Sequence, residues 1–277
     1  MDNKFNLKRF GKYFAYDLRS IWKEQRVFLL VWCLLPVFFY MVYMFFSAFG
    51  HGFFSILNGI SINRPPLAIR VSVFSLASIL FLVLFPSRTY GFVTEKAKGS
   101  AWLMLPASRL EKFLSMILIC LVVAPVAYFC VYLLSDALVC LLDKQCGSSI
   151  LAAWNEFFTN RLTDNQVWLG GNGLWTLVSS CLQITSVFLL GALIFKKMKV
   201  TKTILALFVV SMVLFAVFTT FVSHADLSTF GERIAAWMSG HAENIDLWIN
   251  FFGNLELAII VIGCGIWSWF RVRNLQH

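Results

Sequence analysis

Long apolar runs alternate with short polar connections along most of the chain. A helix that rises about 1.5 Å per residue needs roughly 20 residues to cross a hydrocarbon layer about 30 Å thick, and six runs approach or exceed this length. We therefore predict an all-α, polytopic membrane protein with six transmembrane helices. The predicted spans are Val27–Phe49, Ala68–Phe85, Phe113–Leu142, Leu174–Phe195, Thr203–Val222 and Asn254–Phe270.

The first 26 residues have a different pattern, because they are too polar to span a membrane but sort clearly by helical angle. Apolar positions fall on one face and basic positions on the other, which is typical of a helix that lies flat among lipid headgroups. The apolar face contains Leu7, Phe10, Phe14, Leu18 and Ile21, and the basic face contains Lys8, Arg9, Lys12, Arg19, Lys23 and Arg26. We predict a cytoplasmic amphipathic elbow helix over residues 1–26, a transmembrane domain over 27–270 and a cytoplasmic tail over 271–277. The elbow helix either moves with the first span or only anchors the chain to lipid.

Composition supports the membrane prediction, and the distribution of charge gives it an orientation. Apolar residues make up 59% of the 277 positions and charged residues 13%. Of the 23 Lys and Arg residues, 18 fall in the N-terminal segment, the second and fourth connections and the C-terminal tail, and 5 fall on the other face. Cytoplasmic loops carry the excess of Lys and Arg, so both termini are predicted to be cytoplasmic. Because these cations lie beside helix ends, we assign the net charge of +9 to anionic lipid and not to nucleic acid.

The sequence lacks the common catalytic signatures. GxxxxGK[ST], HExxH and GxSxG are all absent, so the chain has no ATPase motif of its own. We expect no enzyme activity and no catalytic, cofactor or metal site. His224-Ala-Asp226 and His241-Ala-Glu243 leave one alternative, a membrane enzyme that uses these predicted outer residues as metal ligands.

Ionisable residues inside the predicted spans are few. Asp136 and Glu256 lie near the outer ends of their runs, so we expect interfacial positions, which argues against ion-coupled transport. Cys140 and Cys146 either form a disulfide on the outer side or remain two thiols. Apolar residues at helical spacing from Leu227 to Met238 predict a short outer helix between the fifth and sixth spans.

The connection between the second and third spans, residues 87–112, contains the most informative segment, EKAKGSAWLMLPASRLEK at 95–112. Gly99-Ser100 is a helix-start signal and Pro106 is a stop signal, so a short amphipathic helix is expected between them. Ser108 and Glu111 have the spacing of a capping box, which suits the start of the third span. The apolar side chains of this segment would contact either lipid or a groove on a cytoplasmic partner.

The same segment resembles the E(K/R)xxG(T/S)…LPx(S/T)RxE loop of type-2 ATP-binding-cassette transporter permeases. The matching residues are Glu95-Lys96, Gly99-Ser100, Leu105-Pro106, Ser108-Arg109 and Glu111-Lys112, and Lys96 and Lys98 replace the acidic residues that many members have before the glycine. The predicted elbow helix, six spans and short outer helix are similar to that family in outline. In the family, this loop is a coupling helix that docks on a separate ATPase subunit.

The resemblance implies a permease subunit of an ATP-driven exporter in the bacterial inner membrane. Its expected partners are an ATPase subunit, a second permease subunit that is identical or related, and the lipid bilayer. The residues expected to contact the ATPase are Glu95, Trp102, Leu103, Leu105, Pro106 and Arg109. The alternative is a sensor or scaffold protein that binds another cytoplasmic partner and transports nothing. The sequence leaves the transported substrate open.

Overall fold

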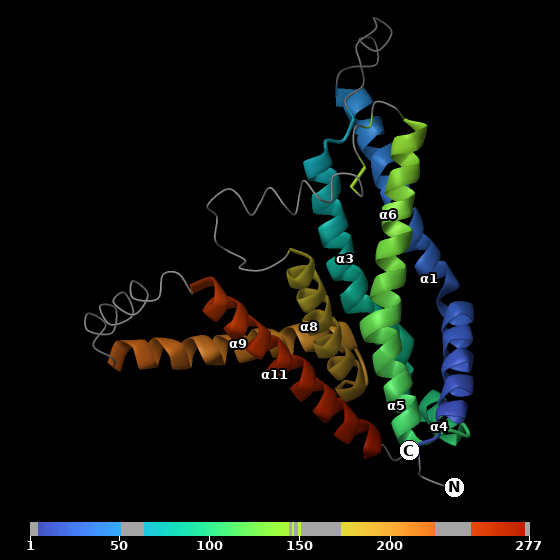
Figure 1. The fold of residues 1–277 in the computed structure, drawn as a ribbon, viewed down its shortest axis with the longest axis vertical. Coiled ribbons are helices and arrows are strands. Elements are labelled where there is room, and N and C mark those ends of the chain that lie inside the picture. Colours follow the sequence, from blue (N-terminus) through green and yellow to red (C-terminus); the bar gives the residue numbers. More distant parts are fainter. Residues whose placement is uncertain are drawn as a thin grey trace, which may run out of the picture. The chain divides into compact units, whose positions relative to one another are not determined.

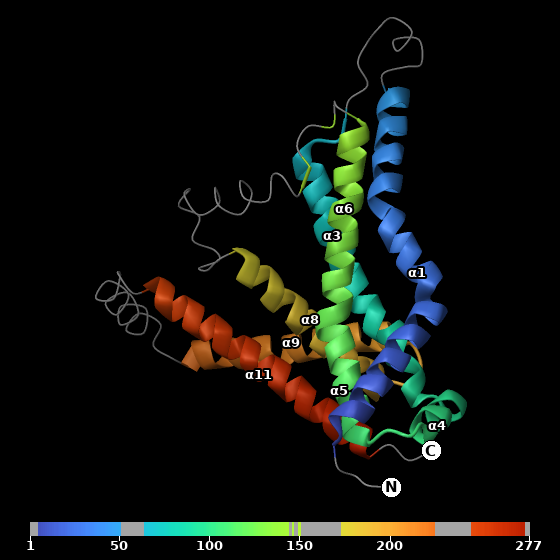
Figure 2. The same cartoon turned by 45° about the vertical axis from the view of Figure 1, so that its right-hand side comes forward.

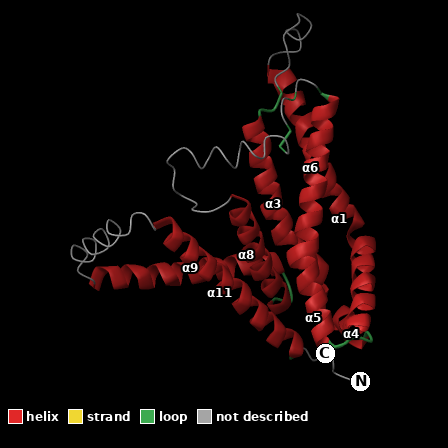
Figure 3. Cartoon of the chain, viewed as in Figure 1, coloured by secondary structure: helices red, strands yellow, loops and turns green. Residues whose placement is uncertain are grey.

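The computed structural model describes residues 5–50, 64–143, 146, 149–150, 173–224 and 245–274. Within these ranges every regular element is a helix and no strand occurs (Figure 3), so the all-α prediction is confirmed. The predicted outer helix from Leu227 to Met238 lies outside the described residues, as does His241.

Five helical stretches are long and apolar enough to cross a membrane, and they lie within Leu7–Ser47, Leu67–Thr94, Arg109–Leu142, Lys199–Thr220 and Phe251–Arg273. A multi-pass membrane protein is therefore supported. The predicted fourth span falls on helix α8 (Gly173–Ile194), whose described apolar part, Val178–Ile194, is shorter than a full span. The sixth membrane crossing thus stays a prediction.

Helix α1 (Leu7–Gly50) is continuous for 44 residues and includes both the predicted elbow and the first predicted span. A separate elbow helix therefore also stays a prediction. The side chains of Lys8, Lys12 and Lys23 are exposed, as the basic face requires. Arg9 belongs to the same basic face but is less exposed, because its side chain turns toward another helix.

The chain divides into two compact units. The first contains Met1–Phe85 and Leu105–Gln166, and the second contains Pro86–Met104 and Val167–His277. Helix α3 (Leu67–Tyr90) crosses the division at Pro86. Proline removes a backbone hydrogen bond within a helix, so Pro86 lies at a natural point for the division.

In the first unit, helices α1, α3 and α6 (Ala124–Leu142) run side by side (Figures 1 and 2). Aromatic rings join them. Phe81 of α3 stacks on Tyr128 of α6 with ring centroids 4.4 Å apart, and Trp32 of α1 meets the edge of Phe81 at 5.8 Å. Phe74 and Tyr132 repeat the α3 to α6 contact at 4.9 Å. Such ring pairs each contribute about 0.5–1.5 kcal/mol beyond the burial of their area.

Helix α6 continues from α5 (Arg109–Leu118) through a π-helical turn, η2 (Ile119–Val123). Pro125 lies two residues beyond the end of this turn and accounts for it. Its ring has no N–H and would clash with the carbonyl four residues earlier, so the wider π turn relieves the conflict. The continuous run from Arg109 to Leu142 has 34 residues and a length of about 50 Å, which exceeds the hydrocarbon thickness. Both of its ends can therefore lie in polar surroundings.

In the second unit, α8 packs against α9 (Lys199–His224) and α11 (Ile245–Arg273). The approach of α8 to α9 depends on a glycine, because a Cβ atom placed on Gly191 would lie 2.9 Å from the Cβ of Thr203. Small residues permit such close packing of membrane helices. Arg271 near the end of α11 donates a hydrogen bond from Nε to the carbonyl of Leu193 at 3.3 Å. These contacts connect the ends of the three helices.

Candidate functional site

The segment at 95–112 contains a short helix, α4 (Lys96–Met104), which follows a 3-10 turn, η1 (Gly91–Thr94). The sequence predicted a helix start at Gly99-Ser100, and this boundary was wrong by three residues. Gly99 donates its backbone N–H to the carbonyl of Glu95 at 2.8 Å, so Gly99 already lies within the first turn. The predicted stop was correct, because α4 ends at Met104, two residues before Pro106.

Glu95 lies at the junction of η1 and α4, where its side chain is half exposed. Its carboxylate pairs with the ammonium of Lys199, the first residue of α9, at 3.7 Å. The same ammonium donates to the carbonyl of Gly91. An added Cβ on Gly91 would lie 2.8 Å from Nζ of Lys199, so the lysine side chain would have to shift from this position. Lys199 therefore fixes the start of α4 to α9 within the second unit.

The apolar residues of α4 differ in exposure. Trp102 is buried, with 5% of its surface exposed, and Leu103 is half buried. Met104, which the sequence prediction omitted, is 81% exposed. Trp102 is thus placed to hold the helix in position, and Met104 is the apolar side chain of α4 that a partner could reach most easily.

The following residues connect α4 to α5. Leu105 is half buried, whereas Pro106 and Arg109 are exposed. Ser108 caps α5 as predicted, since its hydroxyl accepts the backbone N–H of Glu111 at 3.2 Å and Glu111 accepts the N–H of Ser108 at 3.0 Å. The capping box fixes the direction in which the chain enters α5.

Glu111 has a second set of partners, which the sequence analysis did not predict. Its carboxylate is fully buried and accepts from Arg9 of α1 through Nε at 2.8 Å and Nη2 at 2.8 Å. The backbone N–H of Asn6 donates to the same carboxylate at 3.0 Å. We call Asn6, Arg9, Ser108 and Glu111 the Glu111 cluster. It joins the start of α1 to the start of α5.

A second buried contact lies two turns further along α1. Asp17 is 8% exposed and accepts a hydrogen bond from the hydroxyl of Ser115 at 2.8 Å. The spacing of Arg9, Tyr13, Asp17 and Ile21 is four residues, so these side chains share one stripe of α1, and Tyr13, Asp17 and Ile21 are buried. Asp17, which the four-residue spacing places in line with Tyr13 and Ile21, was the available signal for this inward face.

The opposite end of the α5 to α6 run carries another network, which we call the Asp136 cluster: Arg70, Asp136, Cys140, Cys146 and Ile150. Arg70 Nη1 donates to Asp136 at 3.0 Å and contacts the Cys140 sulfur at 2.8 Å. The backbone N–H of Ile150 donates to Asp136 at 2.9 Å. Cys140 and Cys146 are joined by a disulfide, which resolves the two alternatives left by the sequence. Asp136 thus has a structural ion pair in place of a free carboxylate for ion coupling.

A more exposed pair lies nearby on the chain. Arg64 Nε donates to Asp143 at 2.9 Å, and the hydroxyl of Tyr40 donates to the same carboxylate at 2.7 Å. Glu256, the other acid inside a predicted span, is exposed on α11. Among the described residues, no three His, Cys, Asp or Glu side chains gather in a metal-binding group.

The described geometry thus provides a short helix with an exposed end and two buried clusters. Of the outer residues that the sequence offered as metal ligands, Asp226, His241 and Glu243 lie outside the described residues. Comparisons with models of protein families, with curated proteins and with solved structures find no match to this chain.

Proposed function

We propose that the chain is the permease subunit of an ATP-driven exporter in the bacterial inner membrane, and that α4 and the residues up to Arg109 form its contact with a separate ATPase subunit. The observation that carries this proposal is a short helix with an exposed apolar end between two membrane-length helices. The sequence resemblance of residues 95–112 supplies the identity of the partner.

The local contacts support a mechanical role for this segment. Lys199 holds Glu95 at the start of α4. At the other end of the segment, Ser108 and Glu111 join the chain to α5, and Glu111 also binds Arg9 of α1. A force on residues 105–109 would therefore reach two long helices through hydrogen bonds that are already formed. A coupling element has to transmit force in this way, because the ATP-bound and ATP-free partners must favour different permease conformations.

The structure changes the list of side chains on which we place the contact. We now assign it to Met104, Leu105, Pro106 and Arg109, with Leu103 at its edge. Trp102 holds α4 from its buried side, and Glu95 orients the helix through Lys199. The orientation with both termini in the cytoplasm, and a second permease subunit beside this one, belong to the same proposal.

Copurification tests the proposal. A tagged chain is purified from native membranes in mild detergent, and stoichiometric partners are identified by mass spectrometry. Met104→Asp and Leu105→Asp should each lose a P-loop ATPase that the unmodified chain retains, because a carboxylate at an apolar contact cannot be paired. Leu142→Asp is the matched control, since Leu142 is 87% exposed and ends α6.

Retention of the ATPase by both Met104→Asp and Leu105→Asp would refute the proposed contact. A stoichiometric partner without an ATPase motif would support the alternative, a sensor or scaffold. Loss of the ATPase in Leu142→Asp as well would attribute the effect to altered folding, and the contact would then have no support.

A further inference from the structure

The turn between α8 and α9 exposes a group of cations next to an apolar groove, and the proposed function uses neither. The turn contains Lys196, Lys197 and Met198, all of them exposed. Met198 has a φ of 50°, in the left-handed region, which is uncommon for a residue with a side chain. This conformation reverses the chain and starts α9.

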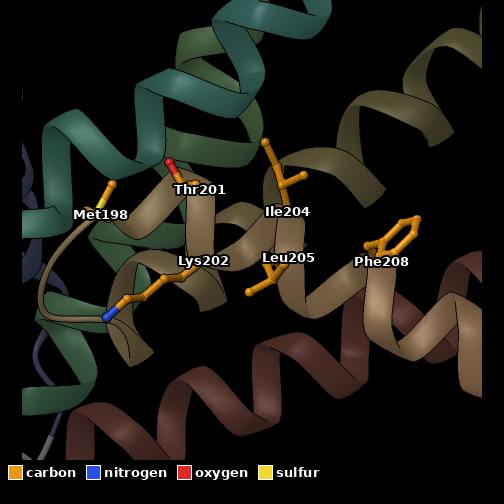
Figure 4. A pocket seen from close by; sticks show the side chains of 6 residues that line it. All are labelled: Met198, Thr201, Lys202, Ile204, Leu205 and Phe208. Carbon is orange, nitrogen blue, oxygen red and sulfur yellow. The ribbon is translucent and has the colours of Figure 1, made fainter.

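The groove runs from this turn along the first three turns of α9. It has a volume of about 320 Å³ and is lined by Met198, Thr201, Lys202, Ile204, Leu205 and Phe208. The spacing of three or four residues places these side chains on one stripe of the helix. Figure 4 shows Met198 and Phe208 at opposite ends of the stripe, with Lys202 directing its ammonium back toward the start of the helix.

The apolar side chains of the stripe are so exposed that they require an apolar environment. Ile204, Leu205 and Phe208 are 53%, 62% and 57% exposed. Because α9 is of membrane length and apolar, lipid acyl chains are its natural surroundings. From Met198 to Phe208 the helix rises about 15 Å, which is comparable to half the thickness of a bilayer's hydrocarbon core.

The cations at one end of the stripe determine which lipid fits best. Lys199 is committed to Glu95 and Gly91, so it is not counted among them. Lys196, Lys197 and Lys202 are exposed at the end from which an acyl chain would enter the groove. An acyl chain gains little by leaving other acyl chains for this groove, so any preference among lipids must come from the headgroup. Three ammonium groups favour a headgroup with a net negative charge.

We propose that this stripe and the three lysines form a binding site for one anionic phospholipid, whose phosphate lies against Lys196, Lys197 and Lys202 and whose acyl chain follows Leu205 and Phe208. The site is independent of ATPase coupling and does not rest on the proposed function.

Native mass spectrometry tests the proposal directly. The purified full chain in detergent micelles is titrated with phosphatidylglycerol and, separately, with phosphatidylcholine of the same acyl chains. We expect one phosphatidylglycerol to remain bound under conditions that remove phosphatidylcholine. Each lysine should contribute roughly fivefold to this affinity, so that Lys196→Gln with Lys197→Gln and Lys202→Gln weakens binding about 100-fold.

A matched control separates a site from general attraction to anions. Lys8→Gln with Lys12→Gln and Lys23→Gln removes the same charge from exposed positions on α1, whose basic face is expected to attract headgroups as a diffuse surface without a groove, and should leave the one retained phosphatidylglycerol in place. Leu205→Trp tests the groove without a change in charge and should weaken phosphatidylglycerol binding at least tenfold. Glycerol phosphate, which has the anion but no acyl chain, should not displace the lipid at equal concentration.

Four results of the lipid titrations would overturn the proposal. These are equal retention of the two lipids, an equal loss in the α1 control variant, displacement by glycerol phosphate, and unchanged binding in the triple lysine variant. A dimer that excludes phosphatidylglycerol would also overturn it, because a second copy of the chain would then occupy the stripe.

Discussion

The two ends of the α5 to α6 run use the same chemistry in different ways. At each end, an acidic residue on this run pairs with an arginine from another helix of the first unit: Glu111 with Arg9, and Asp136 with Arg70. At the Glu111 end, a local capping box also orients the carboxylate. At the Asp136 end, the partners come from α3 and from the chain beyond a disulfide. The Glu111 cluster therefore combines a local capping box with one distant partner helix, whereas the Asp136 cluster depends entirely on residues that tertiary structure brings together.

The ion pairs of the first unit also differ in burial, and this difference should determine how much stability is lost when a pair is broken. The exposed fractions of the side chains are 4% and 6% for Arg70 and Asp136, 34% and 0% for Arg9 and Glu111, and 22% and 23% for Arg64 and Asp143. Removing one partner is costly when the other charge stays buried, and costs little when water can solvate that charge. The three pairs thus form a series in which the cost should fall as the two side chains of a pair, taken together, become more exposed.

Asp136→Asn should have the largest effect. It leaves the buried guanidinium of Arg70 without its counter-charge, so we expect the free energy of unfolding in mixed micelles to fall by about 3 kcal/mol. Denaturant titration followed by tryptophan fluorescence measures this change. Glu256→Gln removes one negative charge at an exposed site and should change stability by less than about 0.5 kcal/mol. Equal effects of the two variants would show that burial does not set the cost.

Glu111→Ala should have an intermediate effect, because Arg9 is about one-third exposed and can reach water. We expect a loss of about 2 kcal/mol, which combines the cap and the ion pair. Glu111→Gln retains a capping side chain but not the charge, so it should lose about half as much. The difference in stability between the two variants measures how much the capping hydrogen bonds contribute to this cluster. If both lost the same amount, the ion pair alone would account for the effect.

Asp143→Asn should have the smallest effect, at most about 1 kcal/mol, because both partners are partly solvated and Tyr40 can still donate its hydrogen bond to the amide oxygen. High salt should reduce the stability difference between this variant and the unmodified chain, whereas the cost of Asp136→Asn should change little. The salt dependence of unfolding, measured for both variants side by side, checks this contrast. A larger salt effect for Asp136→Asn than for Asp143→Asn would contradict the expectation that burial shields an ion pair from salt.

Local signals in the sequence predicted several of these features correctly. The helical class, five membrane-length stretches, the end of α4 before Pro106 and the capping of α5 by Ser108 all depend on hydropathy or on residues within one turn. The start of α4 was missed because Gly99-Ser100 has the composition of a helix start but lies inside the first turn. Prolines and caps act through neighbouring residues, which a sequence displays directly.

The partners of Arg9, Asp17 and Arg70 could not be predicted in this way. Arg9 belongs to the basic face of an amphipathic helix by angle, yet its guanidinium turns inward to Glu111, which is 102 residues away. The Arg70 and Asp136 pair spans 66 residues. Such pairs depend on which helices become neighbours, and hydropathy leaves that choice open. Trp102, which the sequence analysis placed in the ATPase contact, is buried in the chain, and composition alone cannot separate an apolar side chain that packs from one that binds.

The π-helical turn at Ile119–Val123 has a consequence for insertions and deletions in this helix. In a regular α-helix each residue advances the chain by about 100° around the axis, so a change of one residue rotates everything beyond it by that angle. A π turn closes i→i+5 hydrogen bonds and so holds about one residue more than an α turn, and a deletion within η2 can be absorbed by a return to the regular α turn. A deletion in α5 beyond Glu111 would instead turn Tyr128, Tyr132 and Asp136 away from α3 together. The number of residues between Glu111 and Asp136 is therefore as important as their identity, because it sets the angle between the two clusters.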